Sequence, residues 1–84
     1  MSGAERNIVV EYFALFREQA GTGREDVATR AATPAELYRE LQGRHGLSLD
    51  ATRIRVAVND EFAPWDRTLE EGDRVVFIPP VAGG

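Results

Sequence analysis

The chain has 84 residues, no cysteine, one histidine and a formal net charge of −4, which leaves room for one small domain. Without cysteine, disulfides, iron–sulfur ligation and a catalytic thiol are excluded, and one histidine excludes a metal site built from several histidines. The acidic balance argues against a nucleic acid as the main partner, because phosphate recognition requires a basic patch.

The remaining composition also narrows the function. No run reaches the roughly 18 apolar residues of a membrane span, and residues 1–7 lack the apolar region of a signal peptide, so we expect a cytoplasmic protein with no membrane partner. All ten basic residues are arginine, and the sequence contains no lysine. The chain therefore has neither a lysine that could form a Schiff base nor a side chain that could accept an isopeptide bond. An enzyme that acts alone is hard to reconcile with this composition.

The first elements are short and lie close together. Residues 8–13 are rich in β-branched and aromatic residues and predict a strand that is apolar on both faces. Such a strand is either central in its sheet or has one face reserved for a partner. Residues 14–20 predict a short helix that ends at Gly21, and residues 24–30 predict a weak, antiparallel edge strand.

The clearest local signal begins at Thr33. Thr33, Pro34 and Glu36 match a capping box, in which Thr33 accepts from the Glu36 amide and Glu36 accepts from the Thr33 amide. The helix should run to about His45 and end at Gly46. Its apolar stripe, which should face a sheet, consists of Leu37, Tyr38 and Leu41. A structural role for His45 in the last helical turn is favoured over a catalytic one.

The C-terminal half predicts further strands. Residues 54–59 alternate, with Ile54, Val56 and Val58 inward. Phe62 and Trp65 follow a turn in an irregular segment that contains a proline, and Trp65 is expected to cover the core. A tight turn leads into the last strand, residues 74–78. Pro79 and Pro80 then end the sheet, because proline cannot donate to a strand ladder.

This order of elements predicts an α+β fold, with a mixed sheet of four to five strands crossed by one main helix. It resembles the β-grasp order of ubiquitin-like folds, in which the last strand returns to lie beside the first. We expect one domain, residues 1–80, and a flexible Gly-Gly tail, residues 81–84.

The tail has properties that suit delivery of a C-terminal group. Pro79 and Pro80 direct it away from the domain, and residues 80–84 can span about 16 Å at roughly 3.3 Å per residue. Val81 and Ala82 can lie in a partner's groove. Gly83 and Gly84 have no side chain, so the terminal carboxylate can enter a narrow tunnel. A carboxylate must be activated before it can take up sulfur, and without cysteine the sulfur would be carried as a C-terminal thiocarboxylate.

Several segments resemble the small subunit of molybdopterin synthase, a family of ubiquitin-like sulfur carriers. The resemblance covers residues 8–84 and is carried by residues 11–21, residues 57–59, Gly72-Asp73 and, most specifically, Pro79 to Gly84.

The resemblance implies that Gly84 is adenylated by an activating enzyme like those of ubiquitin, which uses ATP, and then receives sulfur from a donor enzyme. The chain itself would bind no cofactor or metal. The tail would insert into the large synthase subunit, within a heterotetramer, and pass sulfur to cyclic pyranopterin monophosphate. The chain would then be a non-catalytic sulfur-donor subunit.

The family's contacts outside the tail map onto Phe13, Phe62 and Ile78. A place in the core is an open alternative for each of them, and Phe62 is the least secure because the family often has an aliphatic residue there.

Two other functions remain open from the sequence. One is a sulfur carrier for thiazole, cysteine or tRNA thiolation, which differs only in the acceptor. The other is a ubiquitin-like protein modifier that is joined to target lysines through Gly84. Identification of the large partner would separate the first from the synthase subunit, and high-mass conjugates would support the second.

Overall fold

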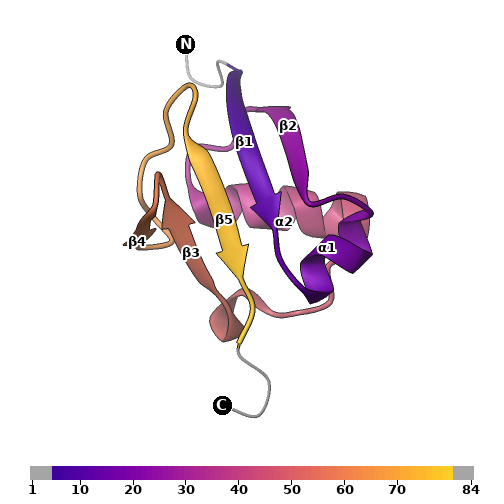
Figure 1. Ribbon diagram of the computed structural model, residues 1–84. Helices are drawn as coiled ribbons and strands as arrows, with labels where there is room; N and C mark the ends of the chain where they lie inside the picture. The colour runs from indigo at the N-terminus through magenta and orange to yellow at the C-terminus, as the bar shows by residue number, and fades with distance from the viewer. Residues whose placement is uncertain (1–4, 81–84) are drawn as a thin grey trace.

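The computed structural model of the chain describes residues 5–80. Its centre is a five-stranded mixed sheet with the strand order β2-β1-β5-β3-β4 (Figure 1). The strands are β1 (Arg6–Tyr12), β2 (Arg24–Thr29), β3 (Arg55–Val58), β4 (Glu61–Ala63) and β5 (Arg74–Ile78). The helices are α1 (Leu15–Ala20), α2 (Pro34–His45) and the short 3-10 helix η1 (Ala51–Arg53).

The sheet combines both kinds of pairing. The β1 and β5 strands are parallel neighbours, whereas β1–β2, β3–β4 and β3–β5 are antiparallel pairs. The last strand therefore lies beside the first, as the resemblance to ubiquitin-like folds implies, and the expected β-grasp fold is confirmed.

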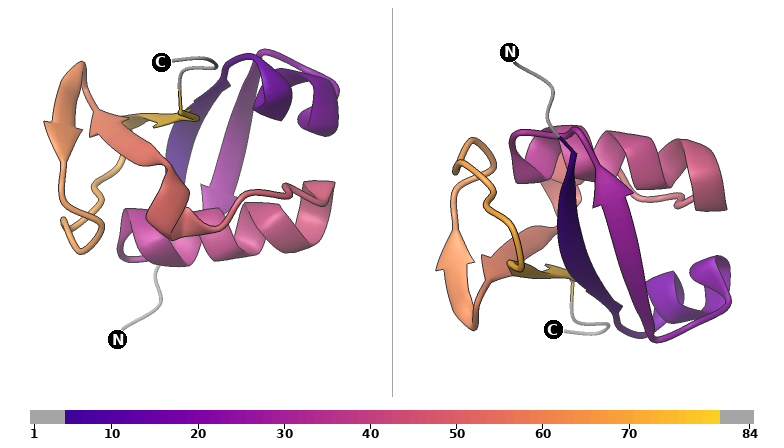
Figure 2. Two further views of the ribbon diagram at one scale, coloured as in Figure 1. Left: turned by 90° about the horizontal axis from the view of Figure 1, so that it is seen from below. Right: turned by 90° about the horizontal axis from the view of Figure 1, so that it is seen from above.

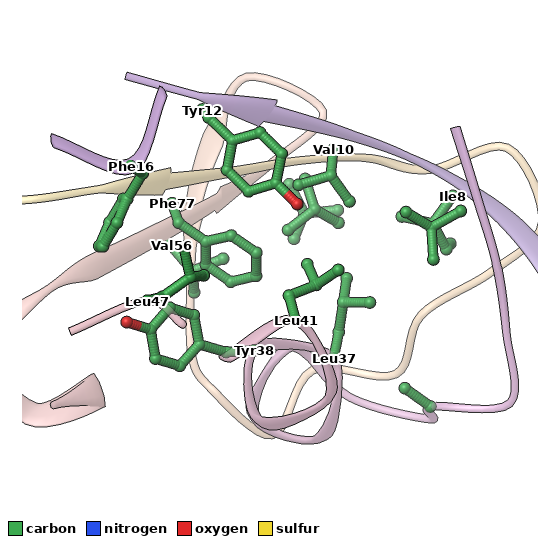
Figure 3. Packing of buried hydrophobic residues seen from close by; sticks show 14 of the residues in the cluster. Ile8, Val10, Tyr12, Phe16, Leu37, Tyr38, Leu41, Leu47, Val56 and Phe77 are labelled. Carbon is green, nitrogen blue, oxygen red and sulfur yellow. The ribbon is translucent and has the colours of Figure 1, made fainter. Parts of the chain in front are cut away.

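Helix α2 covers one face of the sheet, and Figure 2 shows the two layers from the ends of the strands. The core fills the space between them (Figure 3), where Ile8, Val10 and Tyr12 of β1 face the predicted helix stripe. Leu37, Tyr38 and Leu41 are buried. The inner side chains of the neighbouring strands, Val56, Val58, Val75 and Phe77, complete this layer.

Trp65 closes one side of the core, as the sequence predicts. Its ring is stacked on Phe77 with a centroid distance of 6.1 Å, and it contacts Tyr38 edge-on at 6.0 Å. It is partly buried and packs against the core cluster. Aromatic pairs of this kind stabilise a small core beyond the area they bury.

The start of α2 corrects one detail of the predicted capping box. The Oγ1 atom of Thr33 accepts from the Glu36 amide at 3.3 Å, as expected. The Glu36 carboxylate, however, accepts from the amide of Ala32 at 2.8 Å, not from that of Thr33. The side chain thus reaches one residue further back and still satisfies an amide that precedes the helix. Gly46 ends α2 in the left-handed conformation (φ 69°), as predicted.

Several bounds differ from the prediction. Strand β1 spans residues 6–12, against the predicted 8–13, and β3 spans residues 55–58, against the predicted 54–59. Strand β2 ends at Thr29, before the predicted Arg30, and the sequence did not predict η1. Phe62, predicted in an irregular segment, is the middle residue of β4. Within residues 5–80, no helix is long and apolar enough to cross a membrane. The predicted tail, residues 81–84, lies outside the described residues.

Candidate functional site

The side chains on the sheet face opposite α2 form the candidate site. Because side chains alternate along a strand, the inward Val75 and Phe77 leave Val76 and Ile78 on this outer face. Figure 1 views the sheet from this face, with α2 behind the strands.

Neighbouring strands place further apolar side chains beside them. Ala57 of β3 is opposite Val76, and Phe62 of β4 is opposite Ala57. Directly opposed residues of an antiparallel pair share one face of the sheet. Phe13 follows the last residue of β1 and continues its outward parity. These five residues are here called the outer patch: Phe13, Ala57, Phe62, Val76 and Ile78.

The two phenylalanines of the patch are open to solvent, whereas Ala57 and Val76 are buried. All five residues line one depression, together with Glu11 and Asp60. The side chains of Phe13 and Phe62 are 51% and 62% exposed, although burial of such large apolar groups is strongly favoured. Two large apolar side chains that are exposed and line the same depression indicate an interaction site.

The alternative that Phe13 and Phe62 belong to the core is therefore wrong. Ile78 is half-buried at the edge of the patch. Of the residues predicted to contact a partner, Phe13, Phe62 and Ile78 are brought together, although their sequence positions are far apart.

The patch continues to the point where the chain leaves the sheet. A second depression is lined by Phe13, Ala14, Leu15, Leu49, Arg53, Ile78, Pro79 and Pro80. Pro79 and Pro80 thus join the predicted contact residues on one continuous surface. The remaining predicted site residues, Val81, Ala82, Gly83 and Gly84, lie outside the described residues.

The start of β5 is held by a buried carboxylate. Asp73 accepts from the Nδ2 atom of Asn59 at 2.9 Å, from the Glu70 amide at 2.8 Å and from Nη1 of Arg67 at 3.1 Å. Burial raises the pKa of Asp73, but these hydrogen bonds and the charge of Arg67 outweigh it, and the pKa lies below its ordinary value. The Gly72-Asp73 segment therefore fixes the strand that leads to the tail.

No role was predicted from the sequence for two arginines of the outer face. Arg74 pairs with Asp60 and lies 3.9 Å from Glu11, measured from its Nε to the Oε2 atom of Glu11. The guanidinium carbon of Arg55 lies 4.1 Å from the centre of the Phe62 ring. The strand parity was the available signal, because Arg55 alternates with the inward Ile54 and Val56.

Residues 10–84 match the ThiS family. The chain belongs to this family.

Curated relatives support the match over nearly their whole length. The chain is 36% identical to the molybdopterin synthase sulfur carrier subunit of Escherichia coli over 80 residues, which covers 92% of this chain and 99% of the relative. It is 40% identical to the subunit of the same name from Mycobacterium tuberculosis over 78 residues, covering 89% of this chain and 94% of the relative.

Solved structures agree with the fold. A putative molybdopterin converting factor subunit 1 from Pyrococcus furiosus is 30% identical, with a TM-score of 0.75 and coverage of 90% of this chain and 99% of that one. A chain from the complex of molybdopterin-converting factor subunits 1 and 2 of Helicobacter pylori is 25% identical, with a TM-score of 0.65 and coverage of 93% and 99%. SAMP1 of Haloferax volcanii is 28% identical, with a TM-score of 0.75 and coverage of 93% and 99%.

The predicted resemblance is thus confirmed at the level of the family. The ThiS match, residues 10–84, includes all five residues of the outer patch.

Proposed function

We propose that this chain is the sulfur carrier subunit of a molybdopterin synthase and delivers sulfur as a thiocarboxylate on Gly84. The observation that carries the proposal is the near full-length match to relatives of that name. The outer patch supports it, because a carrier must dock on a larger protein and the patch adjoins the exit of the tail at Pro79 and Pro80.

The proposed chemistry starts from the Gly84 carboxylate. A carboxylate is a poor electrophile, so an activating enzyme of the ubiquitin type would join it to AMP, using ATP and releasing pyrophosphate. A sulfide equivalent from a donor enzyme would then attack the carbonyl carbon. The new C–S bond replaces the C–O bond to AMP, which leaves as the nucleotide, and a thiocarboxylate remains. The chain would bind no cofactor of its own.

The proposed acceptor step takes place on the large synthase subunit. Insertion of residues 81–84 into that subunit would bring the thiocarboxylate to cyclic pyranopterin monophosphate. The Helicobacter pylori structure is described as a complex of two subunits, and this supports a large-subunit partner here. We propose a heterotetramer, because the dithiolene product needs two sulfur atoms, and a cytoplasmic location, where ATP is present for the activation step.

A protein-modifier function is the second candidate. SAMP1, a small archaeal modifier protein, has the same fold at a TM-score of 0.75. Both functions need activation of the terminal carboxylate, so the final acceptor distinguishes them: a modifier forms an isopeptide bond with a lysine, whereas a carrier returns unmodified.

The test is the intact mass of the chain after incubation with ATP, the activating enzyme and a sulfur source. The proposal predicts a mass gain equal to the replacement of one oxygen by sulfur, localised to the C-terminal peptide. Adding the large subunit and its substrate should then restore the original mass. The matched control lacks Gly84 only. No mass gain, with an activating enzyme that is competent on another carrier, would contradict the proposal, and conjugates to lysines would favour the modifier.

A further inference from the structure

Arg55 brings a positive charge to the end of the outer patch that lies beside Ile78. Its guanidinium carbon lies 4.1 Å above the Phe62 ring, and its backbone is opposite Ile78. The Arg55 side chain is exposed to solvent. Across residues 5–80, its guanidinium has no carboxylate within the 4.0 Å of a salt bridge. The contact with Phe62 is a cation–π interaction that leaves the N–H donors of Arg55 available.

Arg53 adds a second charge at the same end of the sheet. Both arginines line a depression with Phe62, Ile78, Pro79 and Pro80, at the root of the tail. Arg53 likewise has no ion pair in the described part of the chain. At the far end of the outer patch the situation differs, because Arg74 is paired with Asp60 there. Among the described residues, the unpaired positive charge of this face is thus concentrated beside Pro79 and Pro80, in a chain whose net charge is −4.

This arrangement constrains any partner that covers the patch. A partner that covers Phe62 and Ile78 also covers the guanidinium that lies on the Phe62 ring. Removing an unpaired charge from water is costly unless an acceptor replaces the lost hydration. A carboxylate satisfies the planar guanidinium best, because it accepts two parallel hydrogen bonds from it.

We propose that Arg55, assisted by Arg53, binds a carboxylate on the large synthase subunit at the entrance for the tail. This inference rests on the proposed function, from which the identity of the partner is taken. An apolar patch alone tolerates several docking angles, whereas an ion pair at the root of the tail fixes the register in which Pro80 meets the entrance.

Charge variants of Arg55 test the proposal through the affinity for the large subunit from the same organism, measured by titration calorimetry. Arg55→Leu keeps an apolar stem on the patch and should weaken binding by about tenfold or more, and Arg55→Glu by about 100-fold. A rising salt concentration should weaken the binding of the wild-type chain to the large subunit more than it weakens the binding of Arg55→Leu. The matched control is Arg39→Glu, which makes the same charge change at an exposed position on α2 and should stay within about twofold of wild type.

Thermal unfolding should show all three variants to be folded, because the substituted side chains are exposed. Arg55→Leu binding as tightly as wild type, or more tightly, would overturn the inference, since Arg55 would then have no acceptor. If the wild-type chain still gains sulfur in the intact-mass assay in that case, the proposed function is unaffected. A wild-type chain that neither binds the large subunit nor gains sulfur overturns both.

Discussion

The Nε2 atom of His45 lies 2.9 Å from the Oε1 atom of Glu25, so the last turn of α2 is joined to the edge strand β2. The hydroxyl of Tyr12 donates to the same carboxylate oxygen at 2.8 Å, and Nη1 of Arg44 lies 3.4 Å from Oε2. One carboxylate therefore links the first strand, the edge strand and the helix. This geometry gives His45 the structural role that its place in the sequence indicates.

The first prediction concerns this carboxylate and pH. Burial raises the pKa of Glu25, but hydrogen bonds from His45 and Tyr12 and the charges of His45 and Arg44 outweigh it, so the pKa lies below its ordinary 4.5. A carboxylate with a lowered pKa in the folded state stabilises it above the unfolded-state pKa, and this stabilisation is lost as pH falls through the folded-state value. Glu25→Gln should lower the free energy of unfolding by about 1–2 kcal/mol at pH 7.

The measurement is urea unfolding of Glu25→Gln and wild type from pH 7 down to acid. The difference between the two should shrink as the pH falls from about 4.5, the ordinary value, through the lower folded-state pKa, because the wild-type carboxylate becomes protonated over that range. Glu18→Gln, at an exposed position on α1, is the control and should be close to neutral. A difference that persists unchanged in acid would show that shape, and not charge, makes Glu25 stabilising.

The second prediction concerns the buried carboxylate at the start of β5. Asp73→Asn replaces one acceptor oxygen by an amide group that faces donors from Glu70, Arg67 or Asn59. We expect a loss of about 2–3 kcal/mol in the free energy of unfolding, because buried donors lose a charged acceptor. Denaturant unfolding measures it, with Asp66→Asn at an exposed position as the control. A loss below about 0.5 kcal/mol, the range of ordinary surface changes, would contradict the role assigned to Asp73.

The elements with long, regular patterns were predictable from the sequence. The strand over residues 74–78 and the helix that ends at His45 have the predicted bounds, because each combines a clear period with its own start or stop signal. The β4 strand is only three residues long, too short for a period, and it depends on pairing with β3. The turn before β4 has a signal in the sequence, the pair Asn59-Asp60. In the structure these residues have φ values of 53° and 72°, as in the type I′ turns of β-hairpins.

The candidate site was predictable in part. Phe13 continues the outward parity of its strand, so its exposure follows from the sequence. The exposure of Phe62 does not, because it depends on the register that places Phe62 opposite Ala57. The proximity of Arg55 to that ring likewise requires the tertiary pairing of β3 and β4, which no local pattern specifies.

The third prediction separates binding from folding at Phe13. The side chain is 51% exposed, so Phe13→Asp should change the free energy of unfolding by less than about 0.5 kcal/mol. Binding of the large subunit should weaken by roughly 1–3 kcal/mol, as for a buried interface anchor. Phe13→Leu, the matched control, keeps an apolar contact and should retain most of the affinity. Unfolding of the Asp variant would mean that Phe13 supports the core after all.

The fourth prediction concerns the C-terminal carboxylate that the proposed chemistry requires. Adding one alanine after Gly84 moves the carboxylate beyond the position that the activating enzyme and the large subunit would bind, and deleting Gly84 withdraws it by one residue. Both changes should abolish sulfur transfer, because binding of the reacting group at the correct distance is what allows the reaction. The outer patch and the core are unchanged, so stability and binding of the large subunit should remain close to wild type.

The control carries the added alanine before Met1 and should remain active. The readout is formation of the thiocarboxylate and of the cofactor, with the intact mass recorded after the assay. An extended chain that still supports cofactor synthesis and still has its full mass would refute the carrier mechanism, since no trimming would then explain its activity.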